Sequence, residues 1–146
     1  LCTALGLTEN LLIFGDATGG IYHIVIDDQS PNGFKSVDEY RHNQPIKAIY
    51  PNHSGTRSLI VDDINYAFVF SPVDHSETEV CGYLPKTRYI FWDGSWANIF
   101  VAVSPSDERA ATTFVHVPQG LNGPSVIMLE KTTLPPVFYP ISVVNG

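Results

Sequence analysis

The sequence has few cations, only two cysteines and no long apolar run, and each shortage excludes a class of protein. Eight Lys and Arg residues stand against fifteen Asp and Glu residues, for a net charge of −7. Binding to nucleic acid depends on Lys and Arg contacts to phosphate, so we expect no nucleic-acid partner. A membrane-spanning helix needs about 20 consecutive apolar residues, and no stretch approaches that length. We therefore expect no direct membrane span.

The start of the chain carries no recognisable targeting segment. The chain opens with Leu1, and its single methionine is Met128. Residues 1–7 are too short for a signal peptide and lack a basic lead and a small-residue cleavage site. We expect this chain to be a piece of a longer protein.

The two cysteines, Cys2 and Cys81, both fall in predicted strands. The simpler interpretation is a pair of free, buried thiols in a reducing compartment. The alternative is a single disulfide in a secreted domain. The sequon Asn52-His53-Ser54, which lies in a predicted loop, favours that alternative.

One pattern occurs three times: an apolar strand, a tight polar turn and a second, alternating strand. Ile13, Ile60 and Phe100 occupy equivalent positions, 40 to 47 residues apart. A step of about 40 residues with about four strands per step is typical of β-propeller blades. No segment has the caps and 3.6-residue period of a helix. We therefore predict an all-β fold, a partial WD40-type β-propeller.

The blades are predicted at about residues 2–40, 45–84 and 87–130, and another begins at 137–146. In the second blade, residues 71–78 are expected to loop and Glu79–Leu84 to form the outer strand. In the third blade, the last two strands are expected at Thr112–Val117 and Ser125–Glu130. A closed ring needs about four to eight blades, so these three would be incomplete alone.

Histidine is the residue type that most invites a metal site, with members at His23, His42, His53, His75 and His116. No two of them have the spacing that places two imidazoles on one metal ion. His23 and His116 fall on equivalent strands of different blades, so they could face the central channel together. Ordinary strand histidines are the simpler interpretation, and we predict no metal site and no cofactor.

Other motifs also favour structure over catalysis. Gly15-Asp-Ala-Thr-Gly-Gly20 lacks the lysine and hydroxyl of a phosphate loop and is predicted to be a hairpin turn. The acidic pairs Asp27-Asp28 and Asp62-Asp63 lie at strand ends, where Asp commonly closes a turn, and Asp107-Glu108 lies in a loop. There is no G-x-S-x-G nucleophile elbow. We therefore predict no catalytic residue.

Two tryptophans flank a predicted turn, Trp92-Asp-Gly-Ser-Trp96. Aromatic residues on turns are favourable interface anchors. The simpler interpretation is that each packs partly within its own sheet.

The second blade resembles a known family. The matching pieces are Glu39-Tyr-Arg-His42, Pro45-Ile-Lys47, Gly55-Thr-Arg57 and Phe68-Val-Phe-Ser-Pro-Val73, with Leu12-Ile-Phe-Gly15, Thr18-Gly19 and Phe91-Trp92 on either side. Their order and spacing resemble the WD-repeat subunits of intraflagellar transport complex A.

The resemblance implies a parent protein with two propellers followed by a helical solenoid, in which this chain is the later part of the second propeller. It also implies a non-enzymatic scaffold that supports retrograde transport and the entry of membrane proteins into cilia. The implied partners are other complex A subunits, with complex B, motors and cargo adaptors as further candidates. The rivals are another trafficking scaffold, a propeller hydrolase or a secreted β-rich binding domain.

Overall fold

The computed structural model describes residues 1–80, 89–104, 110–120, 122–135 and 142. Within them the chain forms twelve strands in three antiparallel sheets of four. This confirms the all-β class and the predicted partial propeller of about three four-stranded units. The sheets are β1 (Cys2–Leu7), β2 (Leu11–Asp16), β3 (Gly20–Ile26) and β4 (Phe34–Arg41); β5 (Ile46–Pro51), β6 (Ser58–Asp62), β7 (Ala67–Ser71) and β8 (Ser76–Glu79); and β9 (Tyr89–Trp92), β10 (Ile99–Ser104), β11 (Ala110–Gly120) and β12 (Gly123–Thr133).

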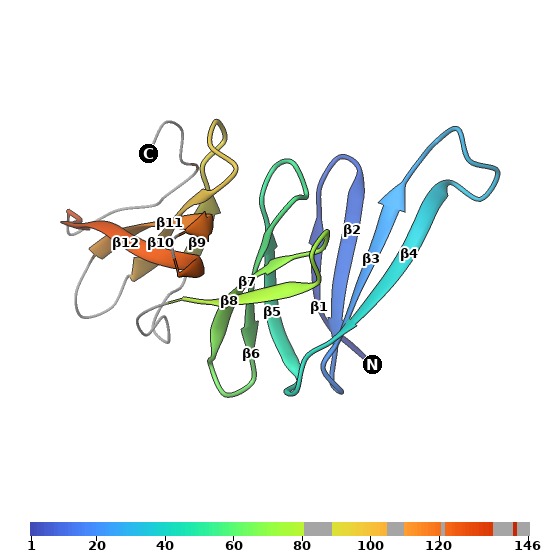
Figure 1. The fold of residues 1–146 in the computed structure, drawn as a ribbon, viewed down its shortest axis with the longest axis horizontal. Helices are drawn as coiled ribbons and strands as arrows, with labels where there is room; N and C mark the ends of the chain where they lie inside the picture. The colour runs from blue at the N-terminus through green and yellow to red at the C-terminus, as the bar shows by residue number, and fades with distance from the viewer. Residues whose placement is uncertain (81–88, 105–109, 121, 136–141, 143–146) are drawn as a thin grey trace.

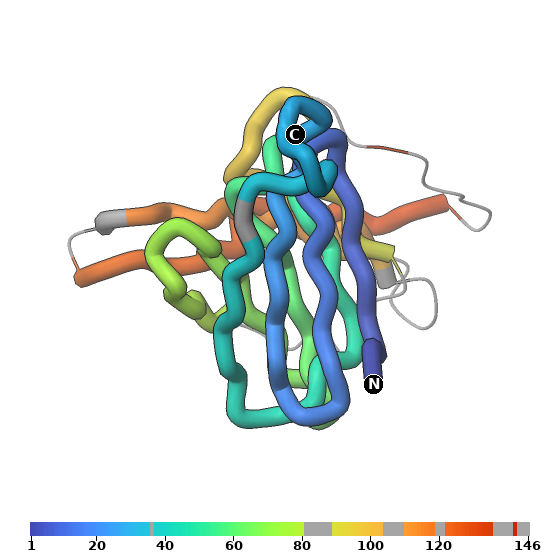
Figure 2. Tube along the Cα trace, turned by 90° about the vertical axis from the view of Figure 1, so that its right-hand side faces the viewer, coloured from blue at the N-terminus to red at the C-terminus, as the bar shows by residue number. Residues whose placement is uncertain are grey.

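The sheets stand side by side along the long axis of the molecule, with β5–β8 in the middle (Figure 1). Strand β5 contacts β1 and β2 of the first sheet, and β9 contacts β5, so the first strands of the three sheets lie together. Figure 2 looks onto the β1–β4 sheet and shows the β11–β12 hairpin running across its strand direction. Strands β4, β8 and β12 therefore form the outer edges. The predicted start of a further unit, residues 137–146, lies outside the described residues apart from Ser142.

The apolar pattern of each strand reflects how many of its faces are covered. Strand β2 alternates buried and half-buried residues, because only one of its faces lies against another sheet. Strand β7 in the middle sheet is buried at every position. One face of this sheet contributes Ile60, Phe68 and Phe70 to the core shared with the first sheet. The other face contributes residues such as Leu59 and Val69 to the core shared with the third.

Two glycines allow the first and second sheets to approach closely. A Cβ atom added at Gly6 would lie 2.6 Å from Pro51 Cδ, and one added at Gly15 would overlap the side chain of Ile46. Both glycines are buried. The inner strands therefore pack backbone against side chain, which a larger residue would prevent.

Three strands differ from their predicted bounds. The outer strand of the second sheet is Ser76–Glu79 and not Glu79–Leu84, of which residues 81–84 lie outside the described residues. The expected loop at 71–78 is a short turn, because Ser71 Oγ reaches Asp74 Oδ2 at 3.4 Å and His75 adopts a positive φ of 48°. In the third sheet β11 and β12 are longer than predicted, since their pairing extends from Ala110↔Thr133 to Gly120↔Gly123.

The prediction that both cysteines are buried was wrong for Cys2, which is exposed and free. It opens β1 at the end of the sheet, opposite Asp16. Cys81 lies outside the described residues. Among the described residues, no helix is long and apolar enough to cross a bilayer.

Candidate interaction surfaces and buried polar clusters

His42 joins the first two sheets through a buried polar cluster. It lies between β4 and β5, with Nε2 3.3 Å from Asp62 Oδ2 and Nδ1 2.7 Å from Glu77 Oε1. Its ring stacks on Phe68, with ring centroids 4.6 Å apart. The connection between blades is thereby fixed to the end of β6 and to the outer strand β8.

Asp62 also shapes the turn that follows it. Its Oδ1 accepts hydrogen bonds from the backbone N–H groups of Ile64 and Tyr66, at 3.1 and 2.7 Å. The other hairpins repeat this device: Asp16 Oδ1 accepts from Thr18 and Gly20, and Asp93 Oδ1 accepts from Ser95 and Trp96. An aspartate at the start of a turn commonly closes it this way.

The turn at Gly15–Gly20 is confirmed as a hairpin, with Gly19 at a φ of 86°. Hydrogen bonds from the Gly20 and Thr18 backbone amides and from the Thr18 hydroxyl lower the pKa of Asp16 to about 2. The carboxylate is therefore held by its own turn, which makes the segment a structural turn and not a phosphate loop.

The His42 cluster borders a small pocket of about 230 Å³. Gln44, Ile64 and Tyr66 line it together with the cluster residues. Burial, followed by the nearby carboxylates of Glu79, Glu77 and Asp62, raises the pKa of the Tyr66 hydroxyl. A general base needs a ring nitrogen directed at a nucleophile. Both nitrogens of His42 face carboxylates, so the cluster has the geometry of a structural link.

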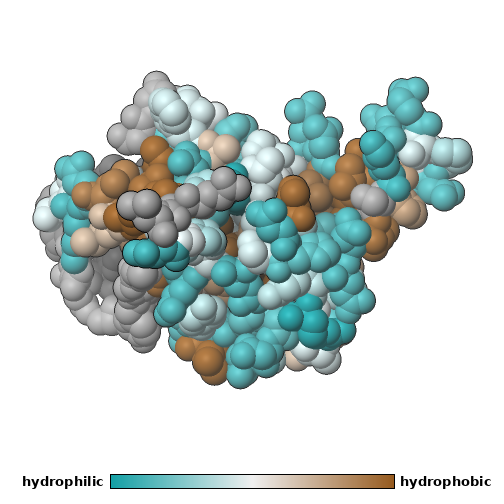
Figure 3. All heavy atoms as spheres, in the orientation of Figure 1, coloured by the Kyte–Doolittle hydropathy of each residue, from teal (hydrophilic) through white to brown (hydrophobic). Residues whose placement is uncertain are grey.

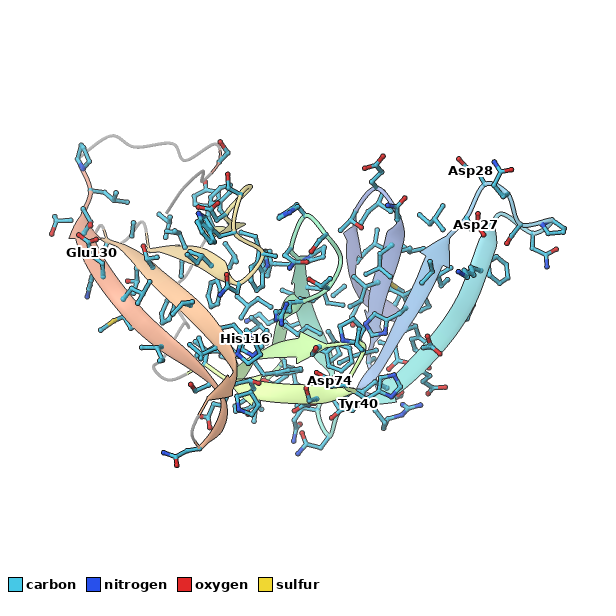
Figure 4. The ribbon with its side chains drawn as sticks, turned by 45° about the horizontal axis from the view of Figure 1, so that its top comes forward. Asp27, Asp28, Tyr40, Asp74, His116 and Glu130 are labelled. Atoms are coloured by element: carbon cyan, nitrogen blue, oxygen red, sulfur yellow. The ribbon has the colours of Figure 1, made fainter. Side chains whose placement is uncertain are left out.

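His23 and His116 do not share a channel. His23 on β3 packs between the first and second sheets, where its ring stacks on Phe70 at 5.0 Å. His116 on β11 lies between the second and third sheets, next to β8 (Figure 4). The idea that they could face one channel together was wrong, because each ring packs between a different pair of sheets.

The surroundings of the two rings differ. Neither nitrogen of His23 has a hydrogen-bond partner among the described residues. His116 Nδ1 accepts from Arg57 Nε at 2.7 Å, and its Nε2 lies 3.4 Å from Thr78 Oγ1. Burial lowers the pKa of His23 to about 4, and burial with the Arg57 charge lowers that of His116 to about 4. Both imidazoles are therefore neutral at pH 7.

Asn52, the sequon asparagine, is fully buried. Its Nδ2 donates to the Ala97 carbonyl at 2.7 Å and to Thr56 Oγ1 at 3.0 Å, and its Oδ1 accepts from the Arg57 amide at 3.2 Å. One amide hydrogen thus closes the β5–β6 turn, and the other holds the second sheet to the third. This geometry opposes glycosylation of Asn52, so the sequon no longer favours the secreted alternative.

The two tryptophans have different surroundings. Trp92 Nε1 donates to the Tyr50 carbonyl at 2.7 Å, and its ring packs on Phe100 at 5.1 Å. Trp92 is thus part of the junction between sheets. Trp96 is 56% exposed on the β9–β10 loop. Of the pair, only Trp96 is placed to contact a partner.

The acidic pairs are engaged in turns where the structure describes them. Asp27 accepts from the Gln29 amide and the Ser30 hydroxyl, each at 3.0 Å. Asp27 and Asp28 lie on the long β3–β4 loop (Figure 4). Asp107-Glu108 lies outside the described residues. No group of three His, Cys, Asp or Glu side chains suited to a metal ion occurs in the described part of the chain.

One face of the first sheet is rich in apolar side chains, and no other described part of the chain covers it. Pairing places Leu5 opposite Phe14 and Leu7 opposite Leu12, and continues the row through Ile24 to Val37. Leu5, Leu7 and Val37 are 61%, 64% and 54% exposed. Figure 3 shows apolar surface on this side of the molecule and also over the third sheet. An apolar sheet face of this kind marks a contact surface.

Comparison with known proteins places this architecture in a family. The family model described as the WDR19 second beta-propeller matches residues 1–146. The chain belongs to the WDR19 second β-propeller family. This confirms the family resemblance seen in the sequence and assigns it, among those WD-repeat subunits, to WD-repeat protein nineteen. The family supports a propeller scaffold role and is not a known class of enzyme.

The curated relatives are much longer than this chain. WD repeat-containing protein 19 of Homo sapiens is 30% identical over the whole chain, which spans 10% of its length. WD repeat-containing protein dyf-2 of Caenorhabditis elegans is 27% identical over 96% of the chain, again 10% of its length. Among solved structures, Kluyveromyces lactis Hsv2 is similar, with a TM-score of 0.56 at 11% identity over 90% of this chain and 62% of that one. This last likeness shows the fold alone.

The polar link of His42 to Asp62 and Glu77 was not predicted from the sequence. An aspartate recurs at the β2–β3, β6–β7 and β9–β10 turns, and this repetition in the sequence indicates the turn role of Asp62. The histidine has no such signal, because its partners lie 20 and 35 residues away along the chain.

Proposed function

We propose that this chain is a non-catalytic scaffold segment of the intraflagellar transport A complex, and that it supports retrograde ciliary transport and the ciliary entry of membrane proteins. It would act in the cilium or flagellum and at the ciliary base, on the cytoplasmic side. Its partners would be other complex A subunits, with complex B, motors and membrane-cargo adaptors as further candidates.

The observation that carries this proposal is the match of the WDR19 second-propeller family to every residue of the chain. The structure supports a scaffold role in physical terms. Buried links from His42, Asn52 and Trp92 fix neighbouring sheets to one another. Rigid sheets hold exposed loops in place, so a partner can bind without a large cost in ordering them.

We also propose that the uncovered face of the first sheet packs against another sheet of the same polypeptide. Leu5, Leu7 and Val37 are exposed on that face here. The first and second sheets bury a comparable apolar row, with Ile13 and Ile21 against Phe68 and Phe70. The chain spans a tenth of the length of its curated relatives, which leaves ample polypeptide for further blades.

The test is co-purification of the tagged full-length protein from ciliated cells, combined with imaging of transport after its removal. We expect complex A subunits in stoichiometric amounts. We also expect fewer retrograde events, with material carried outward accumulating at the ciliary tip because it no longer returns. A reintroduced full-length protein should restore transport, and this is the control.

Stoichiometric recovery of another trafficking complex, with normal retrograde transport, would contradict the complex A assignment. Hydrolase activity that persists in the pure full-length protein would contradict the non-catalytic assignment. For that assay, the Asp62→Asn variant is informative, because it alters the carboxylate beside His42 without changing the size of the side chain.

A further inference from the structure

We propose that the pocket beside His42 binds a cationic side chain of a polypeptide, with arginine as the preferred residue. The pocket lies between the first and second sheets, and its lining consists of His42, Asn43, Gln44, Asp62, Ile64, Tyr66 and Glu77. This binding site is independent of the proposed function, because its ligand is defined by its chemistry and not by the complex in which the protein works.

The pocket has the size of a single side chain. Its volume is about 230 Å³, whereas pockets for drug-sized ligands begin at about 300 Å³. The β4–β5 connection, the β6–β7 turn and strand β8 form its walls. The connection and the turn lie at the same end of their sheets (Figure 1). Ile64 on this turn is 66% exposed, so a side chain of another segment can enter from solvent.

A further blade of the same ring would not reach this pocket. Both sheets that border it, β1–β4 and β5–β8, are present in the structure. Val80, which follows β8, bridges to Val126 of the third sheet. Glu77 lies on the opposite side of β8, where it contacts His42. At the end of β8 the backbone is therefore directed toward the third sheet and away from the pocket.

The pocket has an excess of negative charge. Asp62 and Glu77 line it, and Glu79 lies on the same side of β8 as Glu77. Among the described residues, His42 is the only basic group that pairs with any of these three carboxylates. Even a protonated His42 would leave them in excess. Complementary charge therefore favours a cationic ligand.

The cations that flank His42 in the sequence, Arg41 and Lys47, are engaged elsewhere. Arg41 Nη2 lies 2.6 Å from Glu39 Oε1, and Lys47 Nζ donates to Asn65 Oδ1 at 2.7 Å. The field of the carboxylates acts on Tyr66, whose hydroxyl pKa is raised first by burial and then by these negative charges. A cationic ligand would relieve this repulsion.

The lining favours arginine over lysine. A guanidinium stacks on an aromatic ring and donates two parallel hydrogen bonds to a carboxylate, which an ammonium group cannot do. Tyr66 supplies the ring, and the exposed side chain of Glu79 is able to rotate toward the guanidinium. Ile64 supplies apolar contact for the methylene groups of the arginine.

A metal ion suits the pocket less well than a guanidinium. Asp62 Oδ1 accepts hydrogen bonds from two amides of its own turn, and its Oδ2 lies 3.3 Å from His42 Nε2. Both oxygens of this carboxylate are thus engaged. The described residues also include no group of three His, Cys, Asp or Glu side chains suited to a metal ion.

The first test applies three short peptides to the full-length protein. Each carries a photo-reactive benzophenone beside a central arginine, lysine or citrulline, and citrulline matches arginine in shape without its charge. We expect the arginine peptide to label residues 42–44 and 62–66 about fivefold more than the citrulline peptide, since one ion pair contributes up to about 1 kcal/mol. The lysine peptide should fall between them. High salt should weaken the labelling by the arginine peptide.

Charge variants give an independent readout. Glu79→Lys should reduce labelling by the arginine peptide about fivefold, and Glu79→Gln should reduce it less. Glu9→Lys is the matched control, because Glu9 is exposed on the β1–β2 loop at the opposite end of the sheets (Figure 1). It changes the net charge equally and should leave the labelling unchanged. All three variants should keep the hydrogen exchange of β6 and β7, which shows that the sheets remain folded.

A photo-crosslinker at Ile64 of the full-length protein, within its purified complex, identifies the natural occupant. We expect the crosslinked residue to have an arginine or a lysine beside it. An adduct to another subunit and an adduct to a distant part of the same polypeptide distinguish the two sources, and either supports the site. If no adduct forms, the arginine peptide should label the assembled protein as it labels the free one.

Several results would overturn the proposal. These are equal labelling by the arginine and citrulline peptides, equal loss in Glu79→Lys and Glu9→Lys, an adduct to a segment without Arg or Lys, and a complex that yields neither adduct nor labelling. If complex A subunits co-purify while arginine and citrulline label alike, this proposal fails and the proposed function stands. If another complex is recovered while the preference for arginine remains, the proposed function fails and this proposal stands.

Discussion

Replacing His23 with phenylalanine should stabilise the junction between the first two sheets. His23 is 2% exposed, and both of its ring nitrogens are buried without a hydrogen-bond partner among the described residues. Its ring stacks on Phe70 at an interplanar angle of 12°. Phenylalanine keeps the flat ring for stacking and removes the two unsatisfied polar atoms.

The magnitude follows from the cost of burying an unpaired polar group, about 1 to 3 kcal/mol. Phenylalanine is slightly larger than histidine, and the misfit offsets part of this gain. We therefore expect a net stabilisation of about 1 to 2 kcal/mol. This lowers the equilibrium constant for local opening, and with it the exchange rate of the protected amides, by about 5- to 30-fold. The assay is hydrogen exchange in the full-length protein, read from peptides that cover β3 and β7.

His116→Phe is the matched control, because His116 is buried to the same degree on the corresponding strand of the third sheet. Its nitrogens are paired, and the substitution leaves Arg57 Nε without an acceptor. It should therefore destabilise the second and third sheets by about 1 to 3 kcal/mol. Faster exchange in His23→Phe, or slower exchange in His116→Phe, would refute the reasoning.

Three further predictions concern the same junctions. Gly15→Ala should separate β2 from β5, because a Cβ there overlaps Ile46, and should cost about 2 kcal/mol or more in local stability by hydrogen exchange. Asn52→Ala should cost about 2 to 3 kcal/mol, because it removes four hydrogen bonds, and mass spectrometry of the purified protein should find residue 52 without a glycan. Stability should fall as the pH drops from 6.5 toward 4, because the pKa values of His23 and His116 are held near 4 in the fold and return to 6.5 on unfolding, so protons bind the unfolded chain first. A flat stability profile between pH 7 and 4.5 in the wild-type protein would contradict the last of these.

Strands with a strong local pattern could be predicted from the sequence. Strands β2, β3, β6 and β7 carry the repeated pattern, in which each is an apolar run bounded by a turn with Asp or Gly. The turn at Gly15–Gly20 was likewise readable, since only glycine takes a φ of 86° without strain. Local chemistry determines these elements.

Features that depend on neighbouring sheets could not be predicted in this way. The outer strand β8 is short and polar, and a polar strand of four residues has little periodicity to detect. The burial of Asn52 is set by the Ala97 carbonyl, which lies 45 residues away in the chain. The exposure of Cys2 follows from the uncovered end of the first sheet, which no local pattern reveals.

The central claim is that these sheets are consecutive blades of one propeller, whose first sheet packs against a further blade of the same polypeptide. Electron cryomicroscopy of the full-length protein in its complex tests this most directly. We expect three adjacent four-stranded sheets around one axis, with Leu5 and Leu7 buried against another sheet of the same chain. A self-contained sandwich, or Leu5 and Leu7 left open to solvent in the assembled protein, would contradict it.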